Sequence, residues 1–249
     1  MESQTDWSVL AVDTDSGEVL LESDPDLLLP TASVGKLFLL HHLAEMLDPD
    51  PSLGDLMLRK DGVAPVADSG LWQYLDAPAL TVNDCARLVG AVSDNLATNV
   101  LLDHVGLAPV QAVAARLAAG GSMLNDSVRD VRRPEDPAML SIGCAADWVA
   151  YFRKPHPTVM SWLAPATDLS MVSSAFGLDP LAHTAPEGEL RVWTKTGTDD
   201  GVRAEVGLLE VGERRAAYAV ICRFQGEAGP VLARMRAYGE QLLDMLRSG

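Results

Sequence analysis

The chain has few cysteines and few histidines, which limits the metal and redox chemistry it can carry. Its three cysteines, Cys85, Cys144 and Cys222, are widely spaced and form no Cys-x-x-Cys pair, so the sequence predicts buried free thiols. The five histidines include one adjacent pair, His41 and His42, whose side chains diverge on a helix. We therefore predict no metal site and no cofactor.

Basic residues and long apolar runs are also scarce. Lys and Arg number 19 against 35 Asp and Glu, and the resulting net charge of −16 argues against nucleic acid or anionic membrane as a partner. No apolar run approaches the ~20 residues that a membrane span requires. The first residues lack the basic and apolar regions of a secretory signal, so the chain as given is expected to be cytoplasmic, or secreted if a leader has been removed.

The residues that are present predict one α+β domain over 1–249. Strand patterns occur at the two ends, and helical patterns fill the middle, at about 33–47, 81–92, 96–105, 109–119, 144–152 and 159–163. A final amphipathic helix is expected over 229–246. We predict a five-stranded antiparallel sheet built from both termini, covered by the first and last helices, with an inserted all-helical subdomain. The sheet subdomain should span about 1–32 and 185–249, and the helical one about 33–184.

One serine in the first predicted helix has a lysine three residues after it. Pro30 and Thr31 precede an apolar run, with Thr31 as a possible cap, which predicts a buried helix starting near Ser33. Positions i and i+3 share a helix face, so the Lys36 nitrogen can reach the Ser33 hydroxyl. The chain holds four lysines against fifteen arginines, and only lysine can act as a base when its pKa is depressed. A capping serine with a solvated lysine is the alternative interpretation.

Two further short motifs follow in the sequence. Ser93, Asp94 and Asn95 lie in a break between two predicted helices, and Lys195-Thr196-Gly197-Thr198 lies at the end of a predicted strand. Taken alone, the first is an ordinary helix cap and the second an ordinary surface turn.

Together and in this order, the three motifs resemble the signature of class A β-lactamases and the penicillin-recognising serine hydrolases. The passage from Ser69 through Thr81 to Asn99 and the spacing of the motifs are also similar to that family, and the resemblance covers nearly the whole chain. It implies a serine hydrolase that opens β-lactam rings through an acyl-enzyme.

The resemblance also implies a role for each motif residue. Ser33 would be the nucleophile and Lys36 its base, while Ser93, beside Lys195, would pass a proton to the leaving nitrogen. The backbone N–H groups of Ser33 and Thr198 would form the oxyanion hole. The residues implied in substrate binding are Asn95 as an amide donor, Gly197 as an open strand edge, and Thr196, Thr198 and Arg203 as partners for a carboxylate.

The chain departs from this family where the acyl-enzyme is hydrolysed. Class A enzymes use a glutamate on a loop between the second and third motifs, with an asparagine four residues later. Here Glu135 is the only glutamate in that loop, and Met139 stands at the asparagine position. A thioether cannot donate the hydrogen bond of an amide. Glu135 is therefore either a deacylating base or a solvated loop carboxylate.

Three functions remain open at this stage. The first is a β-lactamase, with slow deacylation if the glutamate is missing. The second is an acyl-transfer enzyme acting on esters, amides or a D-alanyl peptide. The third is a penicillin-binding module that keeps its acyl group without turnover. All three take a small-molecule or peptide partner, and the sequence makes no prediction of the oligomeric state.

Overall fold

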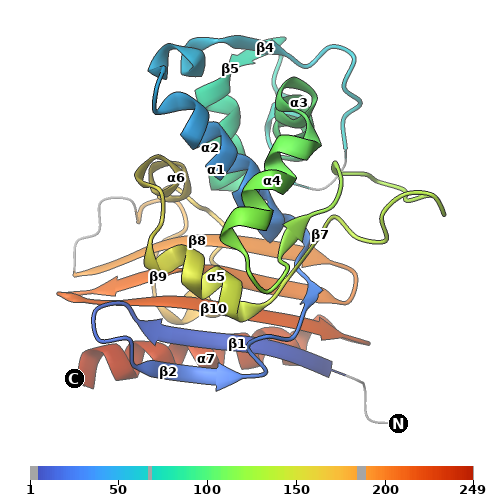
Figure 1. The fold of residues 1–249 in the computed structure, drawn as a ribbon. Coiled ribbons are helices and arrows are strands. Elements are labelled where there is room, and N and C mark those ends of the chain that lie inside the picture. Colours follow the sequence, from blue (N-terminus) through green and yellow to red (C-terminus); the bar gives the residue numbers. More distant parts are fainter. Residues whose placement is uncertain (1–4, 67–68, 184–188, 249) are drawn as a thin grey trace.

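A computed structural model describes residues 5–66, 69–183 and 189–248 of the chain. Its main element is an antiparallel sheet of five strands in the order β2-β1-β10-β9-β8 (Figure 1). The strands come from both ends of the chain, as β1 (Thr5–Asp13), β2 (Val19–Ser23), β8 (Leu190–Asp199), β9 (Val202–Val211) and β10 (Arg214–Phe224). The predicted α+β fold class is therefore confirmed.

Each face of the sheet is covered by helices. The long C-terminal helix α7 (Ala228–Ser248), together with the 3-10 turn η4 (Val172–Ala175), packs on the outer face. On the inner face, α5 (Ala145–Arg153) lies across β1, β9 and β10. We expected the first helix to take this place, which is wrong: α1 (Lys36–Leu47) starts at the sheet and rises away from it (Figure 1).

The helical subdomain surrounds α1, nine of whose twelve residues are buried. A helix that is apolar on all sides belongs in a core, and this one packs among α2 (Val82–Val92), α4 (Leu107–Leu117) and α6 (Pro157–Leu163). The helix α3 (Asn95–Val105) packs against α2 and α4. The same core continues to the inner face of the sheet, so sheet and helices share one hydrophobic cluster.

Short elements connect these parts and, apart from the short helices expected within residues 52–80, were not predicted. They are β3 (Leu29–Pro30), η1 (Ala32–Gly35), η2 (Pro51–Asp55), β4 (Met57–Arg59), η3 (Trp72–Tyr74), β5 (Ala79–Thr81), β6 (Met123–Leu124) and β7 (Ser141–Gly143). Strands of two or three residues are too short to show a periodic pattern. The strands β3, β7 and β6 form a small sheet that borders the functional site.

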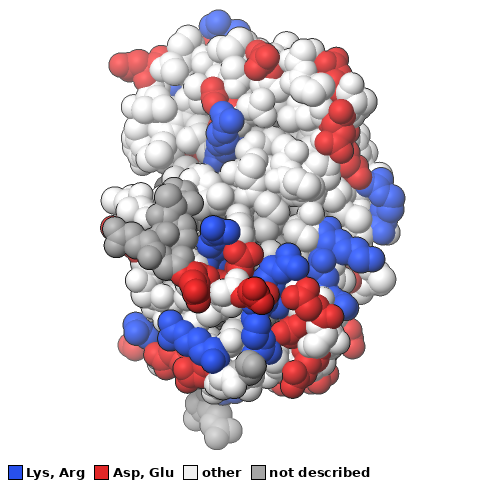
Figure 2. All heavy atoms as spheres, turned by 90° about the vertical axis from the view of Figure 1, so that its left-hand side faces the viewer, with Lys and Arg blue, Asp and Glu red and all other residues white. Residues whose placement is uncertain are grey.

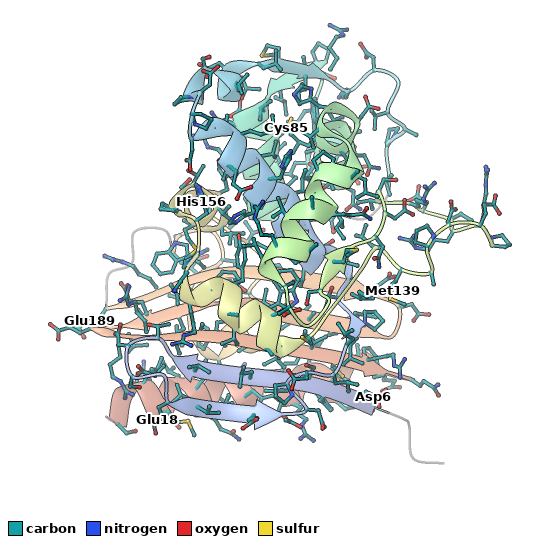
Figure 3. All side chains as sticks on the ribbon, viewed as in Figure 1. Asp6, Glu18, Cys85, Met139, His156 and Glu189 are labelled. Atoms are coloured by element: carbon teal, nitrogen blue, oxygen red, sulfur yellow. The ribbon has the colours of Figure 1, made fainter. Side chains whose placement is uncertain are left out.

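The three cysteines are buried free thiols, as predicted. Cys85 lies inside the helical subdomain (Figure 3), and burial raises the pKa of its thiol to about 12. Among the helices of the described ranges, no single one is long and apolar enough to cross a membrane. The helices α3 and α4 reach that length and composition only jointly, across a bend of 96°.

Charged side chains are unevenly distributed over the face drawn in Figure 2. Acidic and basic side chains gather together on the lower, sheet-bearing half, while those on the upper, helical half are more scattered. The two signs are interspersed, so the net charge of −16 does not form one acidic patch on this face.

Candidate active site

Ser33 lies on a 3-10 turn between β3 and α1, and Ser141 of β7 holds that turn in place. The Ser141 hydroxyl donates to the Ala32 carbonyl at 2.6 Å and lies 2.7 Å from the Thr31 hydroxyl. Thr31 was expected to cap the helix, but its side chain makes no capping bond. Ala32 has a φ of +46°, which is rare for a residue with a side chain. The nucleophile candidate is therefore presented by a strained turn that a neighbouring strand supports.

Gly197 brings the third motif against this turn. A Cβ atom at Gly197 would lie 2.1 Å from the Thr31 carbonyl oxygen and 3.2 Å from the Ser33 backbone nitrogen. We predicted that Gly197 keeps the strand edge open for substrate. The structure gives the missing side chain a second role, because only glycine lets β8 approach the nucleophile's backbone so closely.

Lys36 is fully buried, and its nitrogen has well-placed acceptors. Its Nζ donates to the Ser93 carbonyl oxygen at 2.7 Å and to Asn95 Oδ1 at 2.7 Å, and it lies 3.4 Å from the Ser93 hydroxyl. A neutral amine has two N–H groups and one lone pair. With both N–H groups engaged by Ser93 and Asn95, the lone pair of a neutral Lys36 is left to accept a proton.

Lys195 completes the site from the sheet side. Its Nζ donates to the Ser93 hydroxyl at 2.9 Å and to the Thr196 carbonyl at 2.9 Å. Ser93 therefore stands between the two lysines. It occupies the left-handed conformation at the end of α2, with a φ of +57°, which directs its side chain away from the helix and into the site. Ser33, Ser93 and Lys195 line one pocket, and Lys36 is joined to them through Ser93. Within the described ranges no hydrogen bond links Lys36 Nζ to the Ser33 hydroxyl, which the sequence had predicted it to reach.

The environment lowers the pKa of both lysines. Burial, aided by repulsion from Lys195, holds the pKa of Lys36 well below its ordinary value of 10.5, although Asp94 opposes the shift. Burial also lowers the pKa of Lys195 to about 8, against an opposing attraction from Asp168. Burial therefore favours the neutral form of Lys36, while a pKa of about 8 leaves Lys195 largely charged at neutral pH.

Asp94, the middle residue of the second motif, is structural. Its buried carboxylate accepts hydrogen bonds from the backbone nitrogens of Leu71 (2.7 Å), Trp72 (2.9 Å) and Ala97 (2.8 Å). The bond from Ala97 caps α3, and the other two fix the segment that starts at Ser69. Asp94 thus holds Ser93 and Asn95 at a fixed place beside Lys36.

Ser33 lies where two pockets meet. We call the first, of about 100 Å³, the lysine pocket; its walls include Ser33, Ser93, Asp168, Lys195, Thr196 and Thr198. We call the second, of about 300 Å³, the loop pocket; its walls include Ser33, Asn95, Val128, Arg129, Asp130 and Thr198. Ser69 lines both pockets. Within the described ranges, the Ser33 hydroxyl makes no hydrogen bond of its own, so it faces this space unengaged.

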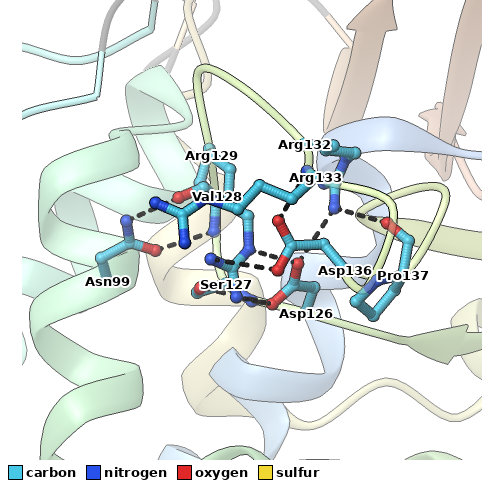
Figure 4. A network of polar contacts seen from close by, with 9 residues as sticks. All are labelled: Asn99, Asp126, Ser127, Val128, Arg129, Arg132, Arg133, Asp136 and Pro137. Atoms are coloured by element: carbon cyan, nitrogen blue, oxygen red, sulfur yellow. Dashed lines mark hydrogen bonds and ion pairs between the residues drawn. The ribbon is translucent and has the colours of Figure 1, made fainter.

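The loop pocket is closed by residues 125–140, which a polar network holds in shape (Figure 4). Asp126 accepts from Arg129 Nε at 2.6 Å and from Arg132 Nη1 at 3.0 Å. Asn99 of α3 exchanges two hydrogen bonds, of 2.8 and 2.9 Å, with the backbone of Val128. The loop that carries Glu135 is therefore joined to α3 through Val128.

Glu135 and Met139 lie away from the nucleophile. Glu135 is exposed in a turn whose ends are joined by a bond from the Arg133 nitrogen to Asp136 (2.8 Å), and it lines neither pocket. Met139, labelled in Figure 3, lines neither pocket either. The residue of this loop that does carry a carboxylate into the loop pocket is Asp130.

Arg203 is likewise separate from the other candidates. Its Nη1 donates to the carbonyl oxygens of Asp199 (2.9 Å) and Val202 (2.7 Å), and its guanidinium lies 5.7 Å from the Phe224 ring centre. It lines neither pocket, whereas Thr196 lines the lysine pocket and Thr198 lines both. Its predicted contact with a substrate carboxylate has no support in this geometry.

Sequence comparison places this fold and site in a family. The model of the β-lactamase enzyme family matches residues 1–242, so the chain belongs to that family, as the motifs indicated. Comparison with curated protein sequences found no significant match.

Solved structures share the fold at low sequence identity. A β-lactamase from Sphaerobacter thermophilus is 21% identical, over 98% of this chain and 94% of its own, with a TM-score of 0.81. A mutant of PBP-A, solved as its acyl-enzyme with penicillin G, is 18% identical, with 98% and 91% coverage and a TM-score of 0.79. A class A β-lactamase from Mycobacterium abscessus is 18% identical, with 98% and 94% coverage and a TM-score of 0.76.

Proposed function

We propose that the chain is a serine hydrolase that opens β-lactam rings through an acyl-enzyme on Ser33 and releases the acyl group slowly. The observation that supports this most directly is the buried Lys36, whose two N–H groups are engaged by Ser93 and Asn95 and whose pKa is depressed. Such an amine is suited to take a proton and not to carry a permanent charge.

Acylation would begin when Lys36 takes the proton of the Ser33 hydroxyl. The Ser33 oxygen then forms a bond to the lactam carbonyl carbon, and the carbonyl electrons move onto oxygen. That oxyanion would be stabilised by the backbone N–H groups of Ser33 and Thr198, which lie on the walls shared by both pockets. The close approach of β8 to the Ser33 backbone at Gly197 supports this assignment.

Ring opening requires a proton on the leaving nitrogen, and Ser93 is placed to supply it. Lys195 donates to the Ser93 oxygen, so the hydrogen of Ser93 itself is left to donate elsewhere. As the carbon–nitrogen bond breaks, Ser93 would give this proton to the nitrogen and regain one from protonated Lys36. The proton that leaves Ser33 thus ends on the product amine, and Lys36 returns to its neutral form.

Deacylation is the weaker half of the proposal. Water must attack the acyl-enzyme with the help of a base, and Glu135 lies outside both pockets. Two acids, Asp130 and Asp199, line the loop pocket with Ser33, and we take Asp130 as the candidate because it lies on the loop between the second and third motifs. Asp130 is exposed on a surface loop, where bulk water competes for its carboxylate, so we expect a long-lived acyl-enzyme.

This feature also favours a second candidate function. If no group of the loop pocket activates water, the protein would be a penicillin-binding module, or an acyl-transfer enzyme that passes its acyl group to a nucleophile other than water. The observation in favour is the placement of Glu135 at an exposed turn.

The experiment that tests the proposal follows the intact mass of the protein after mixing with benzylpenicillin. We expect an adduct of one penicillin on wild type and none on Ser33→Ala. Ser69→Ala is the matched control, because Ser69 lines both pockets but has no lysine three residues later. An adduct that disappears as product accumulates supports a β-lactamase, and one that persists supports the second candidate. Penicillin left intact by wild type, or an adduct on Ser33→Ala, would contradict the acylation mechanism.

A further inference from the structure

The lysine pocket contains one acid, Asp168, that the mechanism above does not use. Among the described residues that line this pocket, Asp168 is the only acid and Lys195 the only base. Asp168 comes from the segment between α6 and η4. Its Oδ1 accepts from the backbone nitrogen of Ser170 at 3.2 Å and from the Ser170 hydroxyl at 2.6 Å, so its carboxylate is fixed in place.

Asp168 and Lys195 face the same space without forming an ion pair. Within the described ranges, no nitrogen of a basic side chain lies within 4.0 Å of the Asp168 carboxylate. The charges nevertheless influence each other, because Asp168 opposes the lowering of the Lys195 pKa. A bound group in this pocket of about 100 Å³ would therefore lie near a cation and an anion at once.

A second carboxyl group lies behind the pocket wall. Glu205 of β9 is fully buried and accepts from the hydroxyls of Thr194 (3.2 Å) and Tyr218 (2.7 Å) and from the Ser173 nitrogen (3.1 Å). Thr194 itself lines the lysine pocket. Burial raises the pKa of Glu205 to about 7, so above neutral pH it adds a second negative charge behind Thr194.

These charges determine which chemical groups of a substrate the lysine pocket can bind next to the scissile bond. A carboxylate would be attracted by Lys195 and repelled by Asp168 and ionised Glu205, and Arg203 donates to backbone carbonyls instead of facing the pocket. The two effects oppose each other, so a carboxylate gains little. A neutral amide fits better, because its N–H can donate to Asp168 while its carbonyl accepts from Lys195 or Thr196.

We infer that Asp168 is a specificity-determining residue, which makes the lysine pocket favour a neutral amide over a carboxylate on the leaving-group side of the substrate. This inference rests on the proposed acylation of Ser33. It directs the search for the natural substrate toward acyl compounds whose leaving portion carries an amide, and away from anionic β-lactams.

The test compares benzylpenicillin with its carboxamide and its methyl ester. The rate constant for adduct formation on Ser33 is measured by intact mass for each compound and divided by the rate constant of its hydrolysis in alkali, which corrects for ring reactivity. For wild type we expect the carboxamide to exceed the carboxylate about tenfold, with the methyl ester between them because it has no N–H donor. In Asp168→Asn the ratio of carboxamide to carboxylate should fall to about one.

Asp55→Asn is the matched control, since it removes the same charge from an exposed position in η2 and should leave the ratio unchanged. Asp168→Ser is a second variant in case Asn disturbs the loop. An unchanged ratio in both Asp168 variants, or a wild-type preference for the carboxylate, would overturn the inference while leaving the acyl-enzyme intact. Failure of all three compounds to acylate wild type would instead overturn the proposed function, and the inference with it.

Discussion

The two pockets that meet at Ser33 differ in how deeply their charged residues are buried. Lys195 lines the lysine pocket and is 2% exposed, and Lys36, which donates to the pocket residue Ser93, is 0% exposed; each donates to one backbone carbonyl and to at least one side-chain oxygen. In the loop pocket, the charged groups are surface residues: Asp130 is exposed, and Arg129 is joined to Asp126 with 39% of its side chain accessible. The groups proposed for acylation are thus part of the core, whereas those available for deacylation are part of a surface loop.

This difference in burial indicates which half of the proposed reaction, acylation or deacylation, should be slow. A buried lysine between fixed acceptors needs no reorganisation when the reaction starts, because folding has already placed it. A carboxylate on a loop must be positioned while water competes for it. We therefore expect the first half of the reaction to be preorganised and the second to limit turnover.

The largest effect should come from removing the amine of Lys36. Lys36→Met keeps the length of the side chain but has no base, and we expect adduct formation with penicillin to fall by about 10²–10⁴. Met removes a buried amine but leaves the Ser93 carbonyl and Asn95 Oδ1 without this donor; because these two effects oppose each other, we expect little change in the free energy of unfolding. The first quantity is measured by intact mass, the second by urea unfolding.

Lys36→Arg is the matched variant, because it keeps a cation but cannot act as a base near neutral pH. Equal loss of acylation in both variants identifies proton transfer as the cause. Adduct formation at the wild-type rate in Lys36→Met would show that Lys36 is not the base of acylation.

The next effect concerns deacylation and separates two carboxylates of the loop 125–140, Asp130 and Glu135. Asp130→Asn should lengthen the lifetime of the acyl-enzyme about tenfold, because Asp130 lines the pocket that Ser33 faces. Glu135→Gln should leave the lifetime unchanged within about twofold, because Glu135 is exposed and lines neither pocket. The lifetime is read from the decay of the adduct mass after excess penicillin is removed.

Neither variant should alter the rate of adduct formation by more than about twofold. If Glu135→Gln lengthened the lifetime of the acyl-enzyme and Asp130→Asn did not, the deacylating base would be Glu135, as the sequence allowed. Loss of acylation in Asp130→Asn would mean that the two pockets are not functionally separate.

A smaller effect is expected in the pH dependence of acylation. Lys36 must be neutral, so the rate should fall in acid as the pH drops through its depressed pKa. Lys195 must be protonated, so the rate should fall again as the pH rises through about 8. The profile of adduct formation against pH should therefore be bell-shaped. In Lys195→Arg the alkaline limb should move up by more than one pH unit, because arginine stays charged.

In Lys195→Arg the acidic limb should move less than the alkaline limb, because burial is the main cause of the lowered Lys36 pKa. An alkaline limb that stays near pH 8 in this variant would assign it to another group.

The sequence was sufficient to predict those site residues that belong to short, recognisable motifs. Ser33 and Lys36 are three residues apart on consecutive turns, and the positions of Ser93 and Lys195 follow from short motifs at the ends of a helix and in a strand. The five strands were visible because their alternation is strong. Ser141 was not predicted, because its role depends on a three-residue strand that meets the nucleophile's turn only in the folded chain.

The acids of the two pockets were missed for a similar reason. Asp168 and Asp130 lie in segments without periodic hydrophobicity, and the sequence contains many exposed acids that look the same. Only the fold shows that these two reach Ser33's surroundings while Glu135 does not. Arg203 was singled out by its separation from Lys195 along the chain, but the direction of its side chain follows from the carbonyls of the β8–β9 turn.

The smallest effect on rate, and the sharpest test of the contrast between the pockets, is expected from Asp126. Burial opposes its ionisation, but hydrogen bonds from Arg129, Ser127 and Arg132 outweigh it and lower its pKa. The stability that Asp126 contributes is therefore present above its unfolded pKa and is lost as the pH falls through the lower, folded value. Asp126→Asn should cost about 1–3 kcal/mol in the free energy of unfolding at neutral pH and weaken the acid dependence of stability.

Asp126→Asn should change the lifetime of the acyl-enzyme by about threefold at most and leave adduct formation unaffected, because the network it supports lies on the loop side only (Figure 4). Asp61→Asn is the control, since Asp61 pairs with Arg59 at an exposed site where an ion pair contributes about 0–1 kcal/mol. The contrary result is that Asp126→Asn changes the rate of adduct formation as much as it changes the lifetime of the adduct. That result would show that the loop also positions the residues of the lysine pocket. Acylation could then no longer be assigned to buried residues alone.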